Sequence, residues 1–510
     1  MTDPLIEPAL QSKARTSLPT DDAPETVRKV FRTLLARNSE EATAYLYELG
    51  TASGYIDRQA LARNIRWTSE EAYGVLECTI NLAKPEKDPR SIAQAARSEK
   101  LRSASPASPG QPPLCDLCWE NEGYAGSPEH PAKPGLRIAP ITLGGEPWGL
   151  QYSPYAYFTE HCIALSRDHR PMKIDASAFD RLLDFVDAFP FYFIGSNADL
   201  PVVGGSILAH DHFQGGRHTF PLMKAGIRGE FGLADFPDVR FAIVDWPAST
   251  IRLASDDRKQ LAHAAERVLA VWRDFSNEAC GIAAFSGPIP HNTLNPIVRK
   301  TGPTYRMELV LRNNRTDAEH PWGIFHPAEH LHHIKKENIG LIEIMGLAVL
   351  PPRLASELPA VQKELVDAAR RNLATRDLEN RLLAQSLTSS HATWAADIYT
   401  RRQEELLSCE GPYPRGNEKE SADGSRVLVS PHPASSTQPD RIPSETPEPT
   451  RGEPSGFGLH PVIKQEVAHA FTTILETTGV FKQTAQGDAG WDSLIEALGK
   501  THREQQKPTS

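Results

Sequence analysis

Apolar residues recur at helical spacing near the start of the chain, where five of them follow the i, i+3, i+4, i+7 rhythm of one helix face. They are Val27, Val30, Phe31, Leu34 and Leu35. The stretch 61–84 keeps this helical character, and Thr68 followed by Glu71 has the form of a capping box. The sequence after it is polar and rich in proline. We therefore expect residues 1–110 to form a helical N-terminal appendage.

Past this region the pattern changes to short apolar alternations broken by Gly-Gly, Pro and Ser-Pro, which is typical of antiparallel strands. An apolar stripe from Phe179 to Val186 predicts a helix that ends before Pro190. Strands and helices of this kind favour an α+β fold, in which helices pack on an antiparallel sheet.

The same order of elements then returns. Residues 239–253 and 302–315 have strand character, and 258–275 form an amphipathic helix pattern. Each part also contains a histidine-rich turn, which indicates an internal duplication. We expect two halves, residues 111–220 and 221–405, each with its own sheet layer and helices.

The C-terminal part contains an abrupt change in composition. Residues 410–458 hold nine prolines and almost no large apolar residues, so this segment cannot bury enough surface to offset its ordering entropy. We expect a disordered insertion there. Residues 459–497 return to helix, with Gly479 as the expected C′ stop of an apolar stripe. The stripe consists of Val467, Ala470, Phe471, Ile474 and Leu475.

Composition narrows the function classes for this 510-residue chain. A net charge of −10 argues against a nucleic-acid partner, and no apolar run approaches the roughly 18 residues of a membrane span. The first residues lack the apolar core of a secretory signal. Six cysteines are too few for a disulfide scaffold, so we expect a reduced, cytoplasmic setting.

Candidate chemistry concentrates in residues 195–216, where two histidines and a glutamine alternate. On a strand these three side chains share one face, and Asp211 and Phe213 share the other. The three are His210, His212 and Gln214. Glycine pairs on both sides allow a close approach of the backbone to an anion; they are Gly204, Gly205, Gly215 and Gly216. The pattern fits a nucleophilic histidine with a phosphate-binding amide, or else an exposed polar strand without chemistry.

Several segments, in the same order, resemble the type 2 galactose-1-phosphate uridylyltransferases. The resemblance covers residues 25–405 and 460–497, and the proline-rich segment departs from it. The segments include CDLCWENEGYAGSPEHPA, QYSPYAYFTEH, FIGSNADLPVVGGSILAHDHFQGG, PHNTLNPIVRK, ELVLRNNRT and HHIKKENIGLIEIMGLAVLPPRL. The resemblance implies a duplicated histidine-triad-like fold. It also implies the transfer of UMP from UDP-glucose to galactose 1-phosphate through a uridylyl-histidine.

The resemblance assigns roles within the motif. His212 matches the nucleophile, and its far ring nitrogen should be held by a backbone carbonyl so that the attacking nitrogen is unprotonated. Gln214 can donate its amide to a phosphoryl oxygen; since it is a poor base for activating water, it favours transfer over hydrolysis. Ser206 is a candidate phosphate contact, or an ordinary turn residue after Gly-Gly.

A metal site is also implied, because type 1 relatives hold a structural zinc with matching residues. Two thiolates and two imidazoles suit tetrahedral zinc. The matching residues are Cys115, Cys118, His169 and His210. Alternatively the cysteines are buried free thiols, and His161 competes as the third ligand.

Further polar residues are candidate substrate contacts: Asn197, Arg312, Asn313, Lys335 and Lys336. Each has a plainer reading, as a hairpin-turn residue or a surface lysine. A second histidine-rich stretch could hold a metal, face the sugar phosphate or be merely solvated; it contains His326, His330, His332 and His333.

Two other functions stay open from the sequence. A dinucleotide phosphorylase or nucleotide hydrolase would belong to the same superfamily. A nucleotide-binding module without catalysis is a different class. The resemblance further implies a homodimer.

Overall fold

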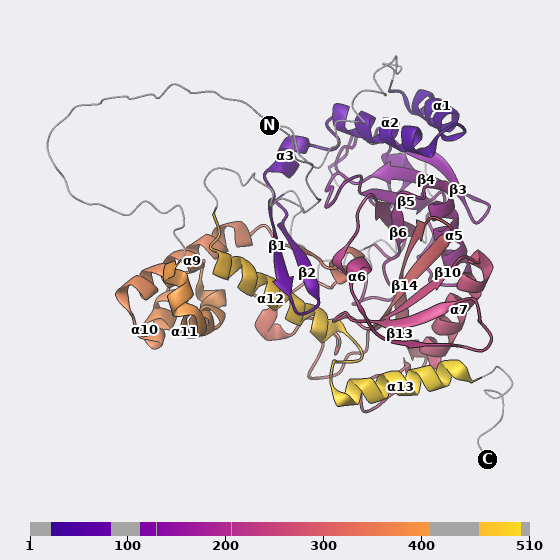
Figure 1. Ribbon diagram of the computed structural model, residues 1–510. Helices are drawn as coiled ribbons and strands as arrows, with labels where there is room; N and C mark the ends of the chain where they lie inside the picture. The colour runs from indigo at the N-terminus through magenta and orange to yellow at the C-terminus, as the bar shows by residue number, and fades with distance from the viewer. Residues whose placement is uncertain (1–21, 83–112, 129, 206, 409–457, 501–510) are drawn as a thin grey trace, which may run out of the picture.

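The computed structural model describes residues 22–82, 113–128, 130–205, 207–408 and 458–500. Ser206 and almost all of the expected insertion at 410–458 lie outside these ranges. At the centre is a ten-stranded antiparallel sheet with the order β3-β4-β5-β7-β6-β13-β14-β10-β9-β8 (Figure 1). In the first half the strands are β3 (Ala139–Leu143), β4 (Glu146–Tyr152), β5 (Cys162–Ser166), β6 (Phe193–Gly195) and β7 (His212–Gly216). In the second half they are β8 (Ile227–Phe231), β9 (Arg240–Val244), β10 (Thr250–Ser255), β13 (Asn292–Thr301) and β14 (Thr304–Asn313).

The strand order confirms the duplication. In the first half three strands form a meander, a helix follows, and the last strand, β7, inserts between β5 and β6. In the second half β14 inserts in the same way between β10 and β13. The two halves meet where β6 pairs antiparallel with β13, so they share one continuous sheet. The domain boundaries at 110, 220 and 405 stay predictions.

Helices cover one face of this sheet. The predicted helices are present as α5 (Ala176–Ala188) and α7 (Arg258–Asp274), which pack on each other and on β13. α1 (Pro24–Leu35) and α2 (Ser39–Ala52) pack against β3 and β4, and α13 (Ala485–Gly499) packs against α7. The N-terminal helices are therefore part of the main core, since Val27 and Phe31 are fully buried in it.

The prediction of helix through residues 61–84 is wrong after its first two residues. The short α3 (Arg58–Ala62) is followed by a hairpin of β1 (Ile65–Glu71) and β2 (Gly74–Ile80). Thr68 pairs with Glu77 across this hairpin and does not cap a helix. β15 (Leu347–Leu350) pairs in parallel with β2, so the hairpin is held by a strand almost 270 residues further along the chain.

The hairpin belongs to a second core on the other face of the sheet. Around it lie α6 (Pro221–Lys224), α8 (Leu341–Ile344) and α12 (Pro461–Thr478). α12 ends where the sequence predicts, but Gly479 is not left-handed, since its φ is −66°. A glycine fits there because a Cβ atom would lie 2.4 Å from the carbonyl oxygen of Pro247.

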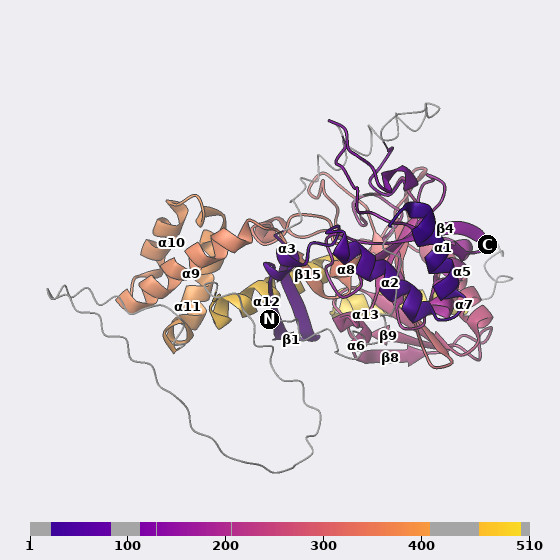
Figure 2. The ribbon, with the colours of Figure 1, turned by 90° about the horizontal axis from the view of Figure 1, so that it is seen from above.

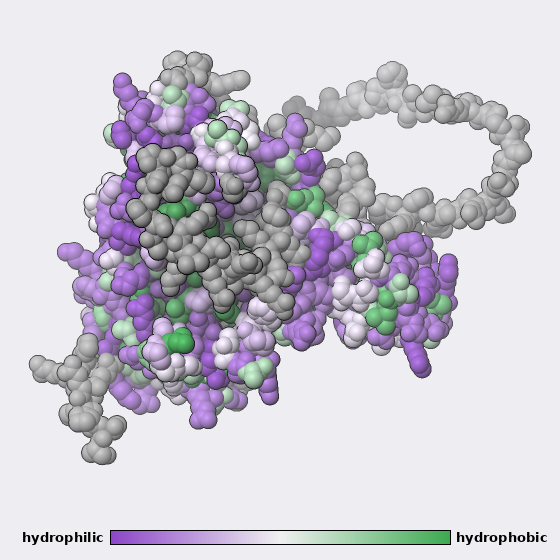
Figure 3. Space-filling view, turned by 180° about the vertical axis from the view of Figure 1, so that it is seen from behind, coloured by the Kyte–Doolittle hydropathy of each residue, from purple (hydrophilic) through white to green (hydrophobic). Residues whose placement is uncertain are grey.

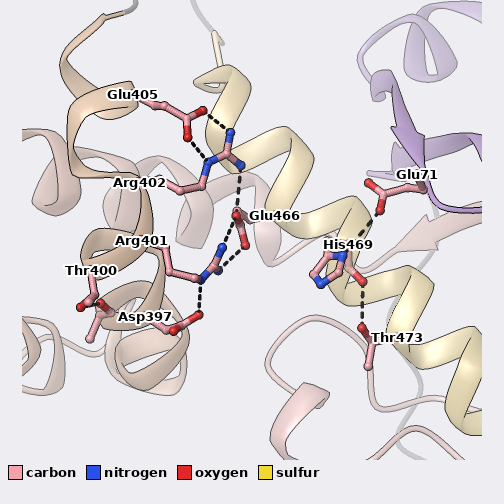
Figure 4. Close-up of polar contacts among 10 residues, drawn as sticks. Glu71, Asp397, Thr400, Arg401, Arg402, Glu405, Glu466, His469 and Thr473 are labelled. Carbon is pink, nitrogen blue, oxygen red and sulfur yellow. Dashed lines mark hydrogen bonds and ion pairs between the residues drawn. The ribbon is translucent and has the colours of Figure 1, made fainter.

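Three helices form a lobe beside the main body (Figures 1 and 2): α9 (Leu354–Arg371), α10 (Thr375–Leu383) and α11 (Ala392–Ser408). α12 joins the lobe to the body (Figure 4), where Glu466 forms ion pairs with Arg401 at 2.8 Å and Arg402 at 3.0 Å. The face in Figure 3 is mostly hydrophilic, with hydrophobic patches on the lobe. None of the described helices is long and apolar enough to cross a membrane.

The remaining short elements lie in connecting segments. They are η1 (Trp119–Asn121), β11 (Phe285–Ser286), β12 (Ile289–Pro290), η2 (Glu329–Leu331) and η3 (Ser389–His391).

Candidate active site and metal centre

The central motif lies at the start of β7, near the middle of the large sheet. Phe213 points to the helix-covered face, where its ring stacks on Trp148 at 5.0 Å between centroids. Because side chains alternate along a strand, His212 and Gln214 point to the opposite face. His212 is only 6% exposed, whereas Gln214 is half-buried. His210 precedes the strand, and its side chain turns toward the two cysteines.

The tautomer of His212 follows from its hydrogen bond. Its Nδ1 lies 2.7 Å from the carbonyl oxygen of His210, and a carbonyl can only accept, so Nδ1 carries the proton. Nε2 then bears the lone pair. Burial lowers the pKa of His212 to about 4, which keeps the ring uncharged at neutral pH. The backbone carbonyl expected beside this ring is thus present.

Gln214 is oriented by a residue to which the sequence gave another role. His161, at the entry to β5, has its Nε2 3.1 Å from Oε1 of Gln214. Burial lowers the pKa of His161 to about 4, so the neutral ring donates through Nε2 to the amide oxygen. That contact directs the NH₂ group of Gln214 away from His161. His161 lies outside the metal-ligand cluster, so it does not compete for a metal.

We expect His161→Ala to lower the turnover rate about 10-fold, because the amide of Gln214 loses its orientation. His161→Asn keeps an N–H donor and should recover part of the loss. Steady-state kinetics separate the two, since a positioning defect lowers kcat more than it raises KM. An alanine variant with the wild-type kcat would show that this contact has no part in turnover.

The four predicted metal ligands converge on one point. The ligand atoms of Cys115, Cys118, His169 and His210 all lie within 4.8 Å of one another. The two Sγ atoms are 3.6 Å apart, and the four sulfur–nitrogen distances run from 3.2 to 3.8 Å. Zinc–ligand bonds of about 2.3 and 2.0 Å in a tetrahedron place sulfur atoms about 3.8 Å apart and sulfur and nitrogen about 3.5 Å apart. The cluster therefore has the size of a tetrahedral metal site.

The protonation of the cluster also suits a cation. His210 donates through Nε2 to the carbonyl oxygen of Ser166 at 3.0 Å, so its Nδ1 lone pair faces the thiols. Cys115 first, and then the His169 and His210 imidazoles, lower the pKa of the Cys118 thiol. A thiolate with imidazole lone pairs around it is a donor set that could hold a metal ion.

Comparisons with known proteins agree with this geometry. Residues 21–171 match the family "Galactose-1-phosphate uridyl transferase, N-terminal domain", and residues 185–396 match its C-terminal domain. The chain belongs to the galactose-1-phosphate uridyl transferase family. Proteins named galactose-1-phosphate uridylyltransferase from Bacillus subtilis and Clostridium acetobutylicum are 42% and 41% identical to it. Each match covers 93% of this chain, and 80% and 82% of the relative.

The solved structure of yeast Ap4A phosphorylase Apa2 is similar to this one over 60% of this chain and 84% of the yeast chain. The two chains are 12% identical in sequence, and the TM-score is 0.33.

In this uridyl transferase family member the glycine pairs have packing partners within the chain. A Cβ atom at Gly204 would lie 2.4 Å from the carbonyl oxygen of Ala198. A Cβ atom at Gly205 would lie 2.6 Å from Nδ2 of the Asn197 side chain. A Cβ atom at Gly215 would lie 2.5 Å from the carbonyl oxygen of Phe193. The glycines therefore let the loop and strand approach neighbouring backbone and, at Gly205, the side chain of Asn197.

Three of the predicted substrate contacts hold the framework of this site. Asn197 accepts a hydrogen bond from the backbone N–H of Leu341 at 2.9 Å. Arg312 is buried and donates to Oδ1 of Asn295 at 2.9 Å and to the carbonyl oxygen of Ile339 at 3.1 Å. Asn313 lies on the same strand and donates to the carbonyl oxygen of Ala283 and to Asn292. Asn197 and Arg312 thus tie the sheet to residues 339–341.

Lys335 lies deeper than the sequence suggests. It is 1% exposed and forms ion pairs of 2.8 Å with both Glu337 and Glu343, besides donating to the carbonyl oxygen of Val349 at 3.1 Å. Lys336, next to it, is half-buried. Lys335 is therefore not part of a surface lysine pair.

The second histidine stretch has mainly backbone partners. His326 contacts the carbonyl oxygen of Pro327 and the side chain of Asn338, and His332 contacts the same carbonyl at 2.9 Å. His333 donates to the carbonyl oxygen of His330 at 2.9 Å. Within the described ranges these histidines form no cluster of three or more metal-ligating groups.

Proposed function

We propose that this protein transfers UMP from UDP-glucose to galactose 1-phosphate through a uridylyl group on His212. The observation that supports this proposal most directly is the state of the His212 ring, which is buried and uncharged. Its Nδ1 donates a hydrogen bond to the His210 carbonyl oxygen, so the lone pair of Nε2 is available to attack phosphorus. Relatives at 42% and 41% identity that bear the name galactose-1-phosphate uridylyltransferase support the choice of substrates.

The proposed reaction has two balanced displacements at one phosphorus. In the first, Nε2 of His212 forms a bond to the uridylyl phosphorus, and the bond to the bridging oxygen breaks. The electron pair stays on that oxygen, which leaves as glucose 1-phosphate. In the second, a phosphate oxygen of galactose 1-phosphate attacks the same phosphorus and the electron pair returns to Nε2, giving UDP-galactose.

Gln214 supplies hydrogen bonding without acid–base chemistry in this proposal. With its oxygen held by His161, the amide has its NH₂ group left to donate to a non-bridging phosphoryl oxygen. An amide does not titrate and is a poor base for water. The adduct on His212 is therefore expected to last until the sugar phosphate arrives, which favours transfer over hydrolysis.

We propose zinc as the ion that the Cys115, Cys118, His169 and His210 cluster holds, because two sulfur and two nitrogen donors with tetrahedral spacing suit it. Zinc held by four protein ligands has a structural role. The ligand His210 would fix the chain two residues before the nucleophile, and its own carbonyl oxygen orients the His212 ring.

Incubation of the full chain with UDP-glucose alone tests the proposal. We expect intact-mass spectrometry to show the addition of one UMP unit, and peptide mapping to place it on His212. Addition of galactose 1-phosphate should then remove the adduct and yield UDP-galactose. Release of free UMP without an adduct would instead support the hydrolase alternative, and absence of any turnover would support the binding module.

The cellular setting and assembly state belong to the proposal as well. The described cysteines are all free thiols, which suits a reducing cytoplasm. We propose a homodimer, which light scattering at several protein concentrations can test.

A further inference from the structure

A cavity of about 380 Å³ opens at the end of the central strands that lies away from His212. Its wall takes in Phe193 at the start of β6, Arg217 directly after β7, and Arg299 near the end of β13. His212 and Gln214 are not among its lining residues. Arg217 follows His212 by five positions of extended chain, a span of roughly 16 Å. The cavity is therefore a place distinct from the proposed transfer centre.

Four basic side chains line this cavity, and three of them already have carboxylate partners. Arg217 pairs with Glu40 at 3.3 Å and Glu160 at 3.5 Å, and Lys300 pairs with Asp187 at 2.6 Å. Lys300 also donates through Nζ to the hydroxyl oxygen of Tyr305 at 2.8 Å. Nε2 of His218 lies 2.8 Å from a carboxylate oxygen of Glu77.

Arg299 is the fourth, and it differs from the others. Among the described residues no carboxylate lies within ion-pair distance of it, and its guanidinium contacts the sulfur of Met223 at 4.0 Å. It is half-buried, and burial first, then the neighbouring Arg306, lower its pKa. The carboxylate that acts on it over a longer range is Glu308.

The carboxylate of Glu308 interacts with two other arginines, Arg252 and Arg306. It is fully buried, and its Oε1 lies 3.0 Å from Nε of Arg252 and 2.8 Å from Nε of Arg306. One carboxylate thus stands among three guanidiniums, those of Arg252, Arg299 and Arg306. Three positive charges and one negative charge leave two positive charges in a partly desolvated place. Such a balance is costly unless an anion compensates it.

We propose that this cavity binds a phosphate group, with Arg299 as its principal ligand and His218 beside it. Arg299 is the member of this cluster that lines the cavity, and its guanidinium N–H groups match phosphate oxygens. Arg252 and Arg306 already donate to backbone carbonyl oxygens, those of Leu222, Ala225 and Met223. The phosphate can be inorganic or part of a phosphorylated sugar or nucleotide. Phe191 lines the same cavity, and the guanidinium of Arg217 lies 4.7 Å from the centre of its ring.

Arginine-selective modification of the full chain with phenylglyoxal tests the site. Mass spectrometry of the Arg299 peptide should show several-fold slower labelling in inorganic phosphate than in chloride at equal ionic strength. Equal labelling in the two salts would overturn the proposal. Parallel arms with galactose 1-phosphate and UMP, compared at equal concentration with inorganic phosphate, identify the source of the phosphate by the strongest protection.

Calorimetric titration with phosphate gives a second, independent measurement. Arg299→Gln should weaken phosphate binding at least 10-fold, whereas Arg376→Gln, on an exposed position of α10, should not change it. His212→Ala should keep this phosphate binding, which distinguishes the cavity from the transfer centre. Unchanged affinity in Arg299→Gln would contradict the proposal, and so would its loss in His212→Ala. The labelling result stands if Arg299→Gln fails to fold.

Discussion

A His212→Ala enzyme is expected to lose transfer from UDP-glucose to galactose 1-phosphate by on the order of 10⁴-fold or more, because no other group takes over the covalent step. The ring of His212 is held by the His210 carbonyl with Nε2 as its unprotonated nitrogen. Removal of that nitrogen removes the bond to phosphorus. The same variant should form no UMP adduct by intact-mass spectrometry.

Two controls make the result specific. His263→Ala removes an exposed histidine from α7 and should leave both the rate and the adduct unchanged. His212→Asn tests whether a side chain of similar size restores folding without chemistry. Circular dichroism should show folded protein for each variant. A folded His212→Ala enzyme with rapid transfer would disprove the covalent mechanism.

The second large effect is expected at the cluster of Cys115, Cys118, His169 and His210, where we propose a zinc ion. Cys118→Ser should lose the bound metal and about 4 kcal/mol or more of stability, because metal loss is among the strongest destabilising changes and leaves buried polar ligands without a partner. Elemental analysis gives the metal content, and thermal unfolding gives the stability. A chelator should lower the melting temperature of the wild type and have little effect on the variant.

The matched control is Cys280→Ser, which changes a partly exposed cysteine outside the cluster. It should keep its metal and unfold at the wild-type temperature. We also expect Cys118→Ser to lose activity together with its metal, since His210 belongs to the same cluster and its carbonyl oxygen holds the ring of His212. If Cys118→Ser retained full metal and stability, the cluster would not be a metal site.

The sequence predicted those elements whose signal is local. Helix α5 and helix α7 each carry an apolar stripe that needs no distant partner to be recognised, and both are present. The hairpin at 65–80 was missed because its strand character depends on pairing with β15, far along the chain. Ile65 to Thr68 do alternate between buried and exposed positions, but this signal spans only four residues, and the capping-box pattern of Thr68 and Glu71 favoured helix.

In the candidate site, too, the sequence predicted some residues and missed contacts between distant segments. The family resemblance pointed to four candidate metal ligands, and the structure brings them together. The part played by His161 could not be predicted, because its partner Gln214 lies on the neighbouring strand. The burial of Lys335 could not be predicted from the sequence either. Its two carboxylate partners, Glu337 and Glu343, reach it only through the fold of residues 337–343. Contacts of this kind are decided by tertiary packing.

The hairpin of β1 and β2 also sets an order of events during synthesis. Trp67 donates through its indole nitrogen to the carbonyl oxygen of Lys464 at 3.1 Å, across 397 residues of chain. Strand β2 needs β15, and the core around them needs α12. While the ribosome is still making the sheet, the hairpin therefore has no lasting partner. The second core closes only when the last tenth of the chain has emerged, so a chain truncated before α12 would expose the apolar surface of the hairpin.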